Sequence, residues 1–305
     1  MQPLRPIVAA YYQARGGKPK TITLANCALR RFEEYLGREA TTADLTDTKL
    51  RGWCNARRNQ GATMNTVNGE ANKILAIWRW HARGGQVPPP DFVAPPKEHK
   101  LPRALSREDL QTLSRTALNT RQMIRGVPGN IYWPALIWTC YHTAERIGAV
   151  RQLSSDCIDP RTGWIVFRSE TRKGQRAEIA RRVSAETMEL VCKLLELNLR
   201  APFDPVGNQA WYPYWSALRA ESGLPEWLTP HRLRSSAASH LKTPEDAMRL
   251  LGHKSIATTI ASYRDPRIVK EPSLIKALEK PKPNTLAEKL ANPTRSFLRR
   301  LGWTG

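Results

Sequence analysis

The sequence predicts a mainly α-helical protein with a small β-sheet or hairpin in its second half, divided into two domains. Helical spacing of apolar residues before residue 83, a proline-rich break at 86–103, and a β-branched and aromatic run at 164–168 support this prediction. At 305 residues the chain exceeds one average domain, and its hydrophobic content of 41% is enough to form a core in each of two.

The first domain is expected to be helical. Hydrophobic periodicity predicts helices over 21–36, 46–58 and 63–82. In the first helix the apolar residues recur at helical spacing, namely at Ala25, Leu29, Phe32 and Leu36. Thr46 is a good N-cap for the second helix, and the glycines at 84 and 85 end the third. We therefore place the first domain at residues 1–86.

A proline-rich segment separates the two domains. Residues 86–103 show no hydrophobic period, and their composition is typical of a semi-rigid extended linker. We predict a linker over 87–103 and a second domain over 104–280. Ser106 is expected to begin the first helix of that domain, because a serine cap followed by acidic residues favours a helix start.

A β-hairpin interrupts the helical pattern of the second domain. Its strands are expected at 164–168 and 179–183, with Lys173 and Gly174 near the turn. Residues 184–280 return to helical patterning, and 281–305 form a basic tail interrupted by prolines. The second domain is therefore expected to be of the α+β type.

The charge indicates a polyanionic partner. The chain has 48 Lys and Arg against 27 Asp and Glu, a net charge of +21, which is typical of a nucleic-acid binder. A basic protein without such a partner is the alternative. The five cysteines include no CxxC pair, which argues against a disulfide framework or a zinc site and suggests a reducing cytoplasm. No apolar run approaches the roughly 18 residues that span a bilayer, so we expect no membrane insertion.

Two neighbouring segments contain residues suited to phosphate chemistry. Pro230 marks a helix start, and His231 and Arg234 fall together on a face away from the apolar stripe. Such a pair at a helix N-terminus is a candidate phosphate clamp, although it also fits a solvated surface. Further on, His253 follows a helix end, and periodicity alone favours Tyr263 as a core aromatic residue.

Taken together, these segments resemble the signature boxes of the tyrosine recombinase (phage integrase) family, which includes the Xer and Cre recombinases. The resemblance covers roughly residues 104–270, in the family's order: TAERIGAVRQL, TRKGQ, TPHRLRSSAASHL and LLGHKSIATTIASY. It implies a helical core-binding domain followed by an α+β catalytic domain. It assigns catalytic roles to Arg146, Lys173, His231, Arg234, His253 and Tyr263, with Arg172 as an alternative to Lys173 for the hairpin cation.

The resemblance also implies a mechanism and partners. Tyr263 would attack a DNA phosphate to give a 3′-phosphotyrosyl intermediate, Arg146 and Arg234 would hold the phosphate, and Lys173 would protonate the leaving 5′-oxygen. The histidines would add hydrogen-bond donors or transfer protons. No ATP, metal or other cofactor is expected. The partners would be double-stranded DNA with an inverted-repeat core site and, in a homotetramer, a neighbouring subunit that receives the tail 281–305. A surface-bound amphipathic tail, or a tail helix packed on its own domain, is the alternative, and no membrane partner is expected.

Some positions depart from the family's pattern. The first box commonly reads G-x-R-x-x-E, whereas this chain has Ala144 and Ala149 at the glycine and glutamate positions. Glu145 or Asp156 is then expected to orient the first arginine, and Ser235 replaces a frequent histidine. A type IB topoisomerase, a telomere-resolvase-like strand transferase and a catalytically inactive DNA-binding relative are the rival functions.

Overall fold

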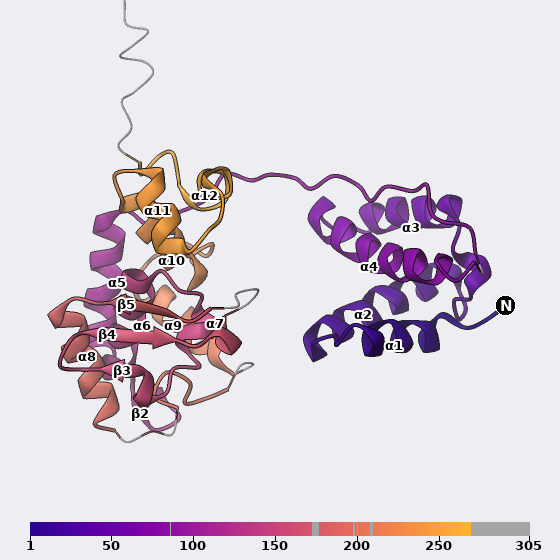
Figure 1. The fold of residues 1–305 in the computed structure, drawn as a ribbon. Helices are drawn as coiled ribbons and strands as arrows, with labels where there is room; N and C mark the ends of the chain where they lie inside the picture. The colour runs from indigo at the N-terminus through magenta and orange to yellow at the C-terminus, as the bar shows by residue number, and fades with distance from the viewer. Residues whose placement is uncertain (86, 173–176, 198, 200, 208–209, 270–305) are drawn as a thin grey trace, which may run out of the picture. The chain divides into compact units, whose positions relative to one another are not determined.

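A computed structural model describes residues 1–85, 87–172, 177–197, 199, 201–207 and 210–269. The chain divides into two compact units, Met1–Lys100 and Leu101–Gly305 (Figure 1). In the described residues no helix has the length and apolar character needed to cross a membrane. The units are mainly helical, and the strands belong to the second, as the sequence predicts.

The first unit is built from the helices α1 (Leu4–Ala14), α2 (Pro19–Leu36), α3 (Asp47–Asn59) and α4 (Met64–Ala82), with a 3₁₀ turn at Thr42–Asp44. The predictions for the last three helices are confirmed to within two residues. Helix α1 was not predicted, although Leu4, Ile7, Val8 and Tyr11 lie at helical spacing and are buried. Its Pro6 lies in the first turn, where a missing backbone N–H is tolerated.

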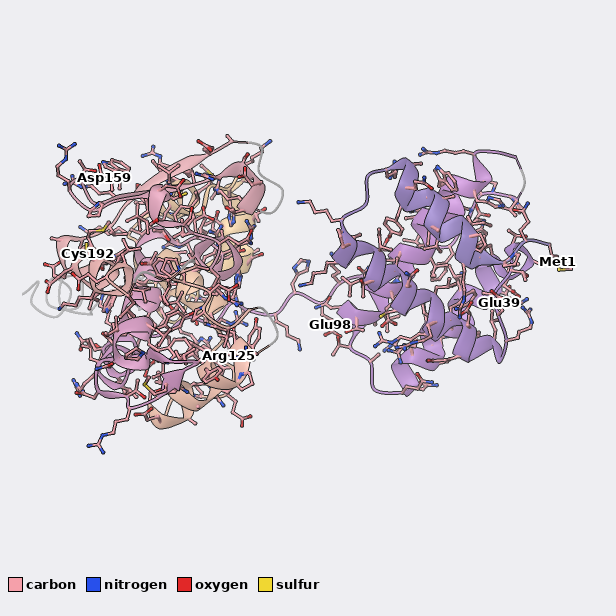
Figure 2. The ribbon with its side chains drawn as sticks, turned by 90° about the horizontal axis from the view of Figure 1, so that it is seen from below. Met1, Glu39, Glu98, Arg125, Asp159 and Cys192 are labelled. Carbon is pink, nitrogen blue, oxygen red and sulfur yellow. The ribbon has the colours of Figure 1, made fainter. Side chains whose placement is uncertain are left out.

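The proline-rich segment forms no helix or strand, but it is anchored to the first unit. Trp78 Nε1 donates to the carbonyl oxygen of Pro88 at 2.7 Å, and Asn68 Nδ2 donates to that of Pro95 at 2.5 Å. Phe92, between them, is buried in the core of this unit. The side chain of Asn65 exchanges hydrogen bonds with the backbone of Glu98, which is labelled in Figure 2. Most of the predicted linker is therefore bound in place rather than free.

The second unit is arranged around one buried helix, α6 (Gly129–Thr143), which contacts α5, α8 and α10. The other helices are α5 (Arg107–Asn119), α7 (Ile147–Val150), α8 (Ala185–Leu195), α9 (Trp211–Glu221), α10 (His231–His240), α11 (Pro244–Leu251) and α12 (Ile256–Tyr263). Helix α6 is apolar on every side, as expected of a helix surrounded by protein.

The predicted hairpin is confirmed as β4 (Trp164–Phe167) and β5 (Ile179–Arg182), which pair antiparallel. A third strand, β3 (Ile158–Asp159), pairs with β4, and a separate two-stranded ribbon joins β1 (Met123–Ile124) to β2 (Val127–Pro128). These short strands were not predicted. The tip of the hairpin, with Lys173 and Gly174, lies outside the described residues, as does the tail 281–305.

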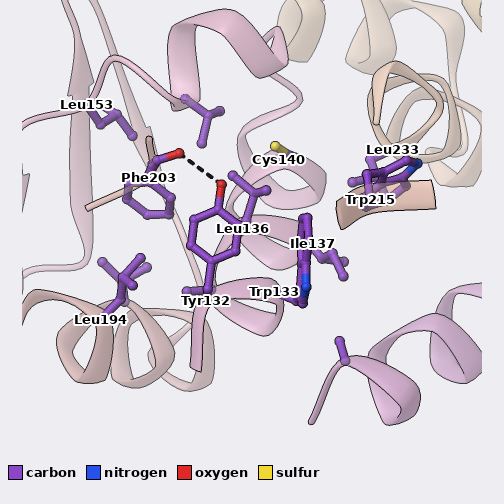
Figure 3. Packing of buried hydrophobic residues seen from close by; sticks show 14 of the residues in the cluster. Tyr132, Trp133, Leu136, Ile137, Cys140, Leu153, Leu194, Phe203, Trp215 and Leu233 are labelled. Atoms are coloured by element: carbon purple, nitrogen blue, oxygen red, sulfur yellow. Dashed lines mark hydrogen bonds between the residues drawn. The ribbon is translucent and has the colours of Figure 1, made fainter. Parts of the chain in front are cut away.

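Aromatic side chains fix α6 in its place. The Tyr132 hydroxyl donates to the carbonyl oxygen of Phe203 at 3.0 Å, the contact drawn as a dashed line in Figure 3. Trp211 Nε1 donates to the same hydroxyl at 2.7 Å. The ring of Trp133 packs edge-on against those of Trp211 and Trp215. Because these contacts hold α6, they also fix the position of the loop that follows it.

Candidate active site

The loop after α6 positions the first candidate residue. Helix α6 ends at Thr143, and Ala144 then adopts a left-handed backbone conformation with φ 47° and ψ 25°. This conformation is uncommon for a residue with a Cβ atom. It turns the chain so that Arg146 lies at the start of the short helix α7. The glycine of the family's pattern is thus replaced here by a buried alanine in a backbone region that favours glycine.

Arg234 is a buried cation that joins two helix ends. Only 1% of the residue is exposed. Its guanidinium donates to the carbonyl oxygen of Ala144, at the end of α6, and to that of Leu251, at the end of α11, the latter at 2.7 Å. Burial lowers the pKa of Arg234, whereas Tyr263 and Glu145 raise it. A guanidinium remains protonated in proteins, so Arg234 is charged although it is buried. Because it is buried, the alternative of a solvated surface arginine is wrong.

His253 is held between Arg234 and α12. As predicted, it follows the end of α11, where Gly252 has φ 66°. Its Nε2 lies 3.4 Å from Nη2 of Arg234, and its Nδ1 lies 3.0 Å from Oγ1 of Thr259. A guanidinium nitrogen only donates, so Nε2 is assigned as the acceptor and the ring hydrogen is assigned to Nδ1. Burial and then the charges of Arg234 and Arg146 lower the pKa of His253 to about 4, so its imidazole is neutral at neutral pH.

Tyr263 is the last residue of α12 and is half-buried. Its ring centroid lies 4.8 Å from that of His253 and 5.6 Å from that of His231. Cζ of Arg234 lies 5.3 Å from the same centroid. Ser239 Oγ donates to the Tyr263 carbonyl oxygen at 3.2 Å, which anchors the backbone behind the ring. The ring therefore packs against a cation and two imidazoles, in addition to the apolar contacts that its periodicity predicts.

His231 and Arg146 complete this cluster. His231 begins α10 and is exposed to solvent. The protein atoms around its ring, followed by the charges of Arg234, Arg232 and Arg146, lower the pKa of His231 to about 4. Since Arg146 lowers the pKa of both His231 and His253, its charge lies within electrostatic reach of both rings.

The structure thus brings together almost all the residues to which the sequence assigns chemistry. These are Arg146, His231, Arg234, His253 and Tyr263, whereas Lys173 lies outside the described residues. Guanidinium groups bind oxyanions through parallel hydrogen bonds, and a neutral imidazole can accept a proton from a phenol. The cluster therefore suits attack by the tyrosine on a bound phosphate ester.

The two carboxylates expected near Arg146 are paired with other arginines. Glu145 is buried, and its Oε1 accepts hydrogen bonds from Nη2 of Arg172 at 2.9 Å and from Nε at 3.2 Å. Asp156 is exposed and pairs with Arg168 in the hairpin. Asp156 therefore belongs to the surface, and Glu145 is the carboxylate that lies within the cluster.

Two further side chains hold the cluster in place and were not predicted. Nη2 of Arg181, on β5, donates to the carbonyl oxygens of Arg249 and Leu250 and so ties the hairpin to the end of α11. Asp265, just after Tyr263, is buried and accepts a hydrogen bond from the backbone of Ala104 at 3.0 Å. Neither lies in a recognisable motif. In the sequence, each is marked only as a charged residue in a segment that the structure shows to be half-buried.

Comparison with known proteins shows which family and which relatives this chain is similar to. Residues 104–268 match the model of the phage integrase family. Among curated proteins, the chain is 26% identical to tyrosine recombinase XerA of Thermococcus kodakarensis, over 82% of this chain and 86% of that protein. It is 28% identical to tyrosine recombinase XerC of Rhizobium meliloti, over 83% of this chain and 85% of that protein.

Solved structures share the fold at lower identity. The Tn1549 transposon integrase in complex with transposon right end DNA aligns with a TM-score of 0.72 and 13% identity, over 95% of this chain and 100% of that chain. A lambda integrase tetramer bound to a Holliday junction aligns with a TM-score of 0.66 and 16% identity, over 92% of this chain and 80% of that chain. At these identities the likeness shows the fold alone.

Proposed function

Because this chain belongs to the phage integrase family, we propose that it is a site-specific DNA recombinase in which Tyr263 is the nucleophile. The enzyme cleaves and rejoins DNA strands. The observation that supports this assignment most directly is the packing of the Tyr263 ring against Arg234, His253 and His231. This packing puts a phenol at a cationic site, which is the requirement for tyrosine attack on a phosphodiester.

The proposed reaction is a transesterification in two steps. The Tyr263 oxygen attacks the phosphorus, a bond forms between them, and the bond from phosphorus to the 5′-oxygen breaks. The phenol proton passes to a neutral histidine, His253 or His231, each of which has a pKa of about 4 in the free protein. Lys173 gives a proton to the departing 5′-oxygen. Attack by a 5′-hydroxyl on the phosphotyrosine reverses these steps and joins the strand, so the bond energy is conserved and no ATP is needed.

Arg146 and Arg234 neutralise the charge that builds on the non-bridging oxygens. Arg234 suits this role because its guanidinium is already fixed by two backbone carbonyl oxygens and needs little reorganisation during the reaction. A bound phosphate would also favour protonated imidazole at His231 and His253, because an anion raises the pKa of a neighbouring histidine. Proton transfer from the phenol would then be easier in the complex than in the free protein.

The rival functions are not favoured. The curated relatives are named as tyrosine recombinases, and they align over most of their length with this chain. An inactive relative would have no need to keep Arg234, His253 and Tyr263 in contact. The contacts among these residues instead support an active strand transferase.

The proposed partner is duplex DNA with an inverted-repeat core site, bound by a homotetramer during strand exchange. A solved relative forms a tetramer on a Holliday junction. Symmetric assemblies use symmetric sites, because each half-site meets an identical subunit. The net charge of +21 suits a protein with many phosphate contacts.

The test uses a library of duplexes with randomised inverted repeats and a nick just 3′ of the cleavage position. On cleavage the short fragment that carries the 5′-hydroxyl dissociates, and the covalent complex is trapped. Adducts are isolated under denaturing conditions, and their DNA is sequenced. The wild-type protein should enrich one family of sites, and Tyr263→Phe should give no adduct. If the wild-type protein forms none, the proposed enzyme activity fails. If Tyr263→Phe still forms one, the nucleophile is another residue.

A further inference from the structure

We propose that Thr259 is a positioning residue that holds the imidazole of His253 with its hydrogen on Nδ1, so that Nε2 is the nitrogen that can take up a proton. Thr259 lies on α12, one helical turn before Tyr263, and it is not among the residues to which the sequence assigns chemistry. The inference rests on the proposed function, since it states which nitrogen of His253 can receive the proton that Tyr263 loses.

Thr259 is buried in a helix whose isoleucines are exposed. Of the eight residues of α12, all of which the structure describes, Thr259 is the one that is fully buried, at 0% exposed. Ile256 and Ile260 on the same helix are 36% and 48% exposed. A hydroxyl is costly to bury unless it forms hydrogen bonds, whereas isoleucine is among the residues most often buried for packing. The polar contacts of Thr259 therefore explain why it faces inward.

The hydroxyl of Thr259 has two partners. Its Oγ1 lies 3.0 Å from Nδ1 of His253, and it donates to the carbonyl oxygen of Ser255 at 3.3 Å. A hydroxyl has a single hydrogen, and a carbonyl oxygen can only accept, so this hydrogen points to Ser255. Oγ1 is therefore the acceptor toward His253, and the hydrogen between these two side chains belongs to Nδ1.

Arg234 favours the same arrangement from the other side of the imidazole. Its Nη2 lies 3.4 Å from Nε2 of His253, and a guanidinium nitrogen has hydrogens to donate but accepts none. The lone pair of the imidazole therefore lies on Nε2. Two independent contacts, one with Thr259 and one with Arg234, thus place the ring hydrogen on the same nitrogen, Nδ1.

This arrangement decides where a proton can be added to His253. Because Nδ1 already carries a hydrogen, the phenol proton of Tyr263 can bind only at Nε2, and the resulting imidazolium still donates to Thr259. The ring centroids of His253 and Tyr263 lie 4.8 Å apart. Since Nε2 faces the guanidinium that is proposed to hold the phosphate, the new N–H forms where it can donate to a phosphate oxygen. In the opposite form, Nε2 would direct a hydrogen at a cation and could accept no proton.

The first test is the position of the ring hydrogen in the full chain without DNA. The pKa of His253 is about 4, so its imidazole is neutral at neutral pH. ¹⁵N NMR of a sample labelled in its six histidines distinguishes a nitrogen with a hydrogen from one with a lone pair, and a His253→Gln sample identifies the signals of His253. The wild-type protein should show the hydrogen on Nδ1. Thr259→Val, which removes the hydroxyl, should lower that share. A wild-type signal with the hydrogen on Nε2 would overturn the proposal, whether or not the variants fold.

The second test is single-turnover cleavage of a selected nicked duplex, with DNA affinity measured in parallel. Thr259→Val should lower the cleavage rate by about 10- to 100-fold, the usual effect of removing a group that orients a functional histidine. DNA affinity should stay within about threefold of wild type, because a buried side chain makes no contact with the bound strand. Thr259→Ser keeps the hydroxyl and should recover most of the rate. In a chain that already carries His253→Gln, Thr259→Val should change the rate by less than about threefold, since Thr259 acts through the imidazole.

Thr258→Val is the matched control, because Thr258 is the neighbouring threonine on α12 and is exposed. It should leave both the cleavage rate and the ring hydrogen of His253 unchanged. A wild-type rate in Thr259→Val, no recovery in Thr259→Ser, or equal losses with and without His253→Gln would overturn the positioning role. Those outcomes are distinct from failure of the proposed function, in which the wild-type protein forms no adduct while the NMR signals of His253 still report the effect of Thr259.

Discussion

Nη2 of Arg234 lies 3.4 Å from Nε2 of His253. The same nitrogen donates to the carbonyl oxygen of Leu251, two residues before His253. One buried cation therefore fixes both the end of α11 and the imidazole that follows it. The position of His253 depends on Arg234 as much as on its own helix.

Arg234→Lys should impair both cleavage and stability. A lysine ammonium is a single point of charge and does not reach Ala144, Leu251 and His253 together. We expect the single-turnover cleavage rate to fall by about 100-fold or more. The free energy of unfolding should fall by about 1–3 kcal/mol, because a buried carbonyl oxygen loses its donor. Arg219→Lys, on α9, is the control for both measurements, and a wild-type rate in Arg234→Lys would contradict the phosphate-holding role.

Acid should destabilise the protein through its histidines. The pKa of His231 and that of His253 are about 4 in the folded chain, against about 6.5 in an unfolded one. Between these values the unfolded chain binds more protons, so the free energy of unfolding is lost as pH falls through this window. We expect Tm to drop more between pH 7 and pH 5 in the wild-type protein than in a His231→Gln/His253→Gln variant. Equal drops in thermal melts would show that these histidines do not titrate as described.

Two buried alanines near Arg146 should respond differently to glycine. Ala144 has φ 47°, whereas Ala149 lies in α7. Ala144→Gly should change the free energy of unfolding by less than about 1 kcal/mol, because relief of the left-handed conformation offsets the lost methyl group and the gain in unfolded-state entropy. Ala149→Gly should cost about 1–2 kcal/mol. Urea denaturation measures both, and equal losses would mean that Ala144 is not strained.

The proline-rich segment should contribute to the stability of the first unit. Phe92 is buried, and Cζ of Arg51 lies 5.7 Å from its ring centroid. Phe92→Ala should lower the local stability by about 3 kcal/mol, as for other buried aromatic residues. Hydrogen exchange in α3 and α4 should accelerate accordingly. The neighbouring Val93 is 78% exposed, so Val93→Ala should leave exchange unchanged, and an equal effect of the two would refute the anchoring.

Helix starts could be predicted where a capping side chain binds the backbone a few residues away. The hydroxyls of Thr46, Thr63 and Ser106 each accept a hydrogen bond from a backbone N–H of the first turn, which is the capping that their sequence context indicates. Strand β3 could not be predicted, because two residues are too few to show a period. The anchoring of the proline-rich segment was also missed, since it depends on Asn and Trp side chains of another element.

The site was predictable only in part. The spacing of His231 and Arg234 puts them near one another on α10, but helical geometry does not reveal which part of the protein covers that face. Burial of Arg234 against α11 is a tertiary result. The pairing of Glu145 with Arg172 is likewise set by how the hairpin packs on the loop after α6. Glu145 and Asp156 were expected to orient Arg146, but the structure pairs them with Arg172 and Arg168 instead, and sequence spacing could not reveal these partners.

The anchoring of Tyr263 bears on whether one copy of the chain could supply this residue to the site of another copy. Its carbonyl oxygen is bound by Ser239, and the following Asp265 is bound by Ser239 and Ala104 of the same chain. These contacts hold the ring of Tyr263, the proposed nucleophile, beside Arg234 of the same chain, so we expect each copy to use its own tyrosine. A mixture of the Tyr263→Phe and Arg234→Lys variants should therefore fail to restore strand cleavage. Neither chain in the mixture holds both the tyrosine and the arginine of one site.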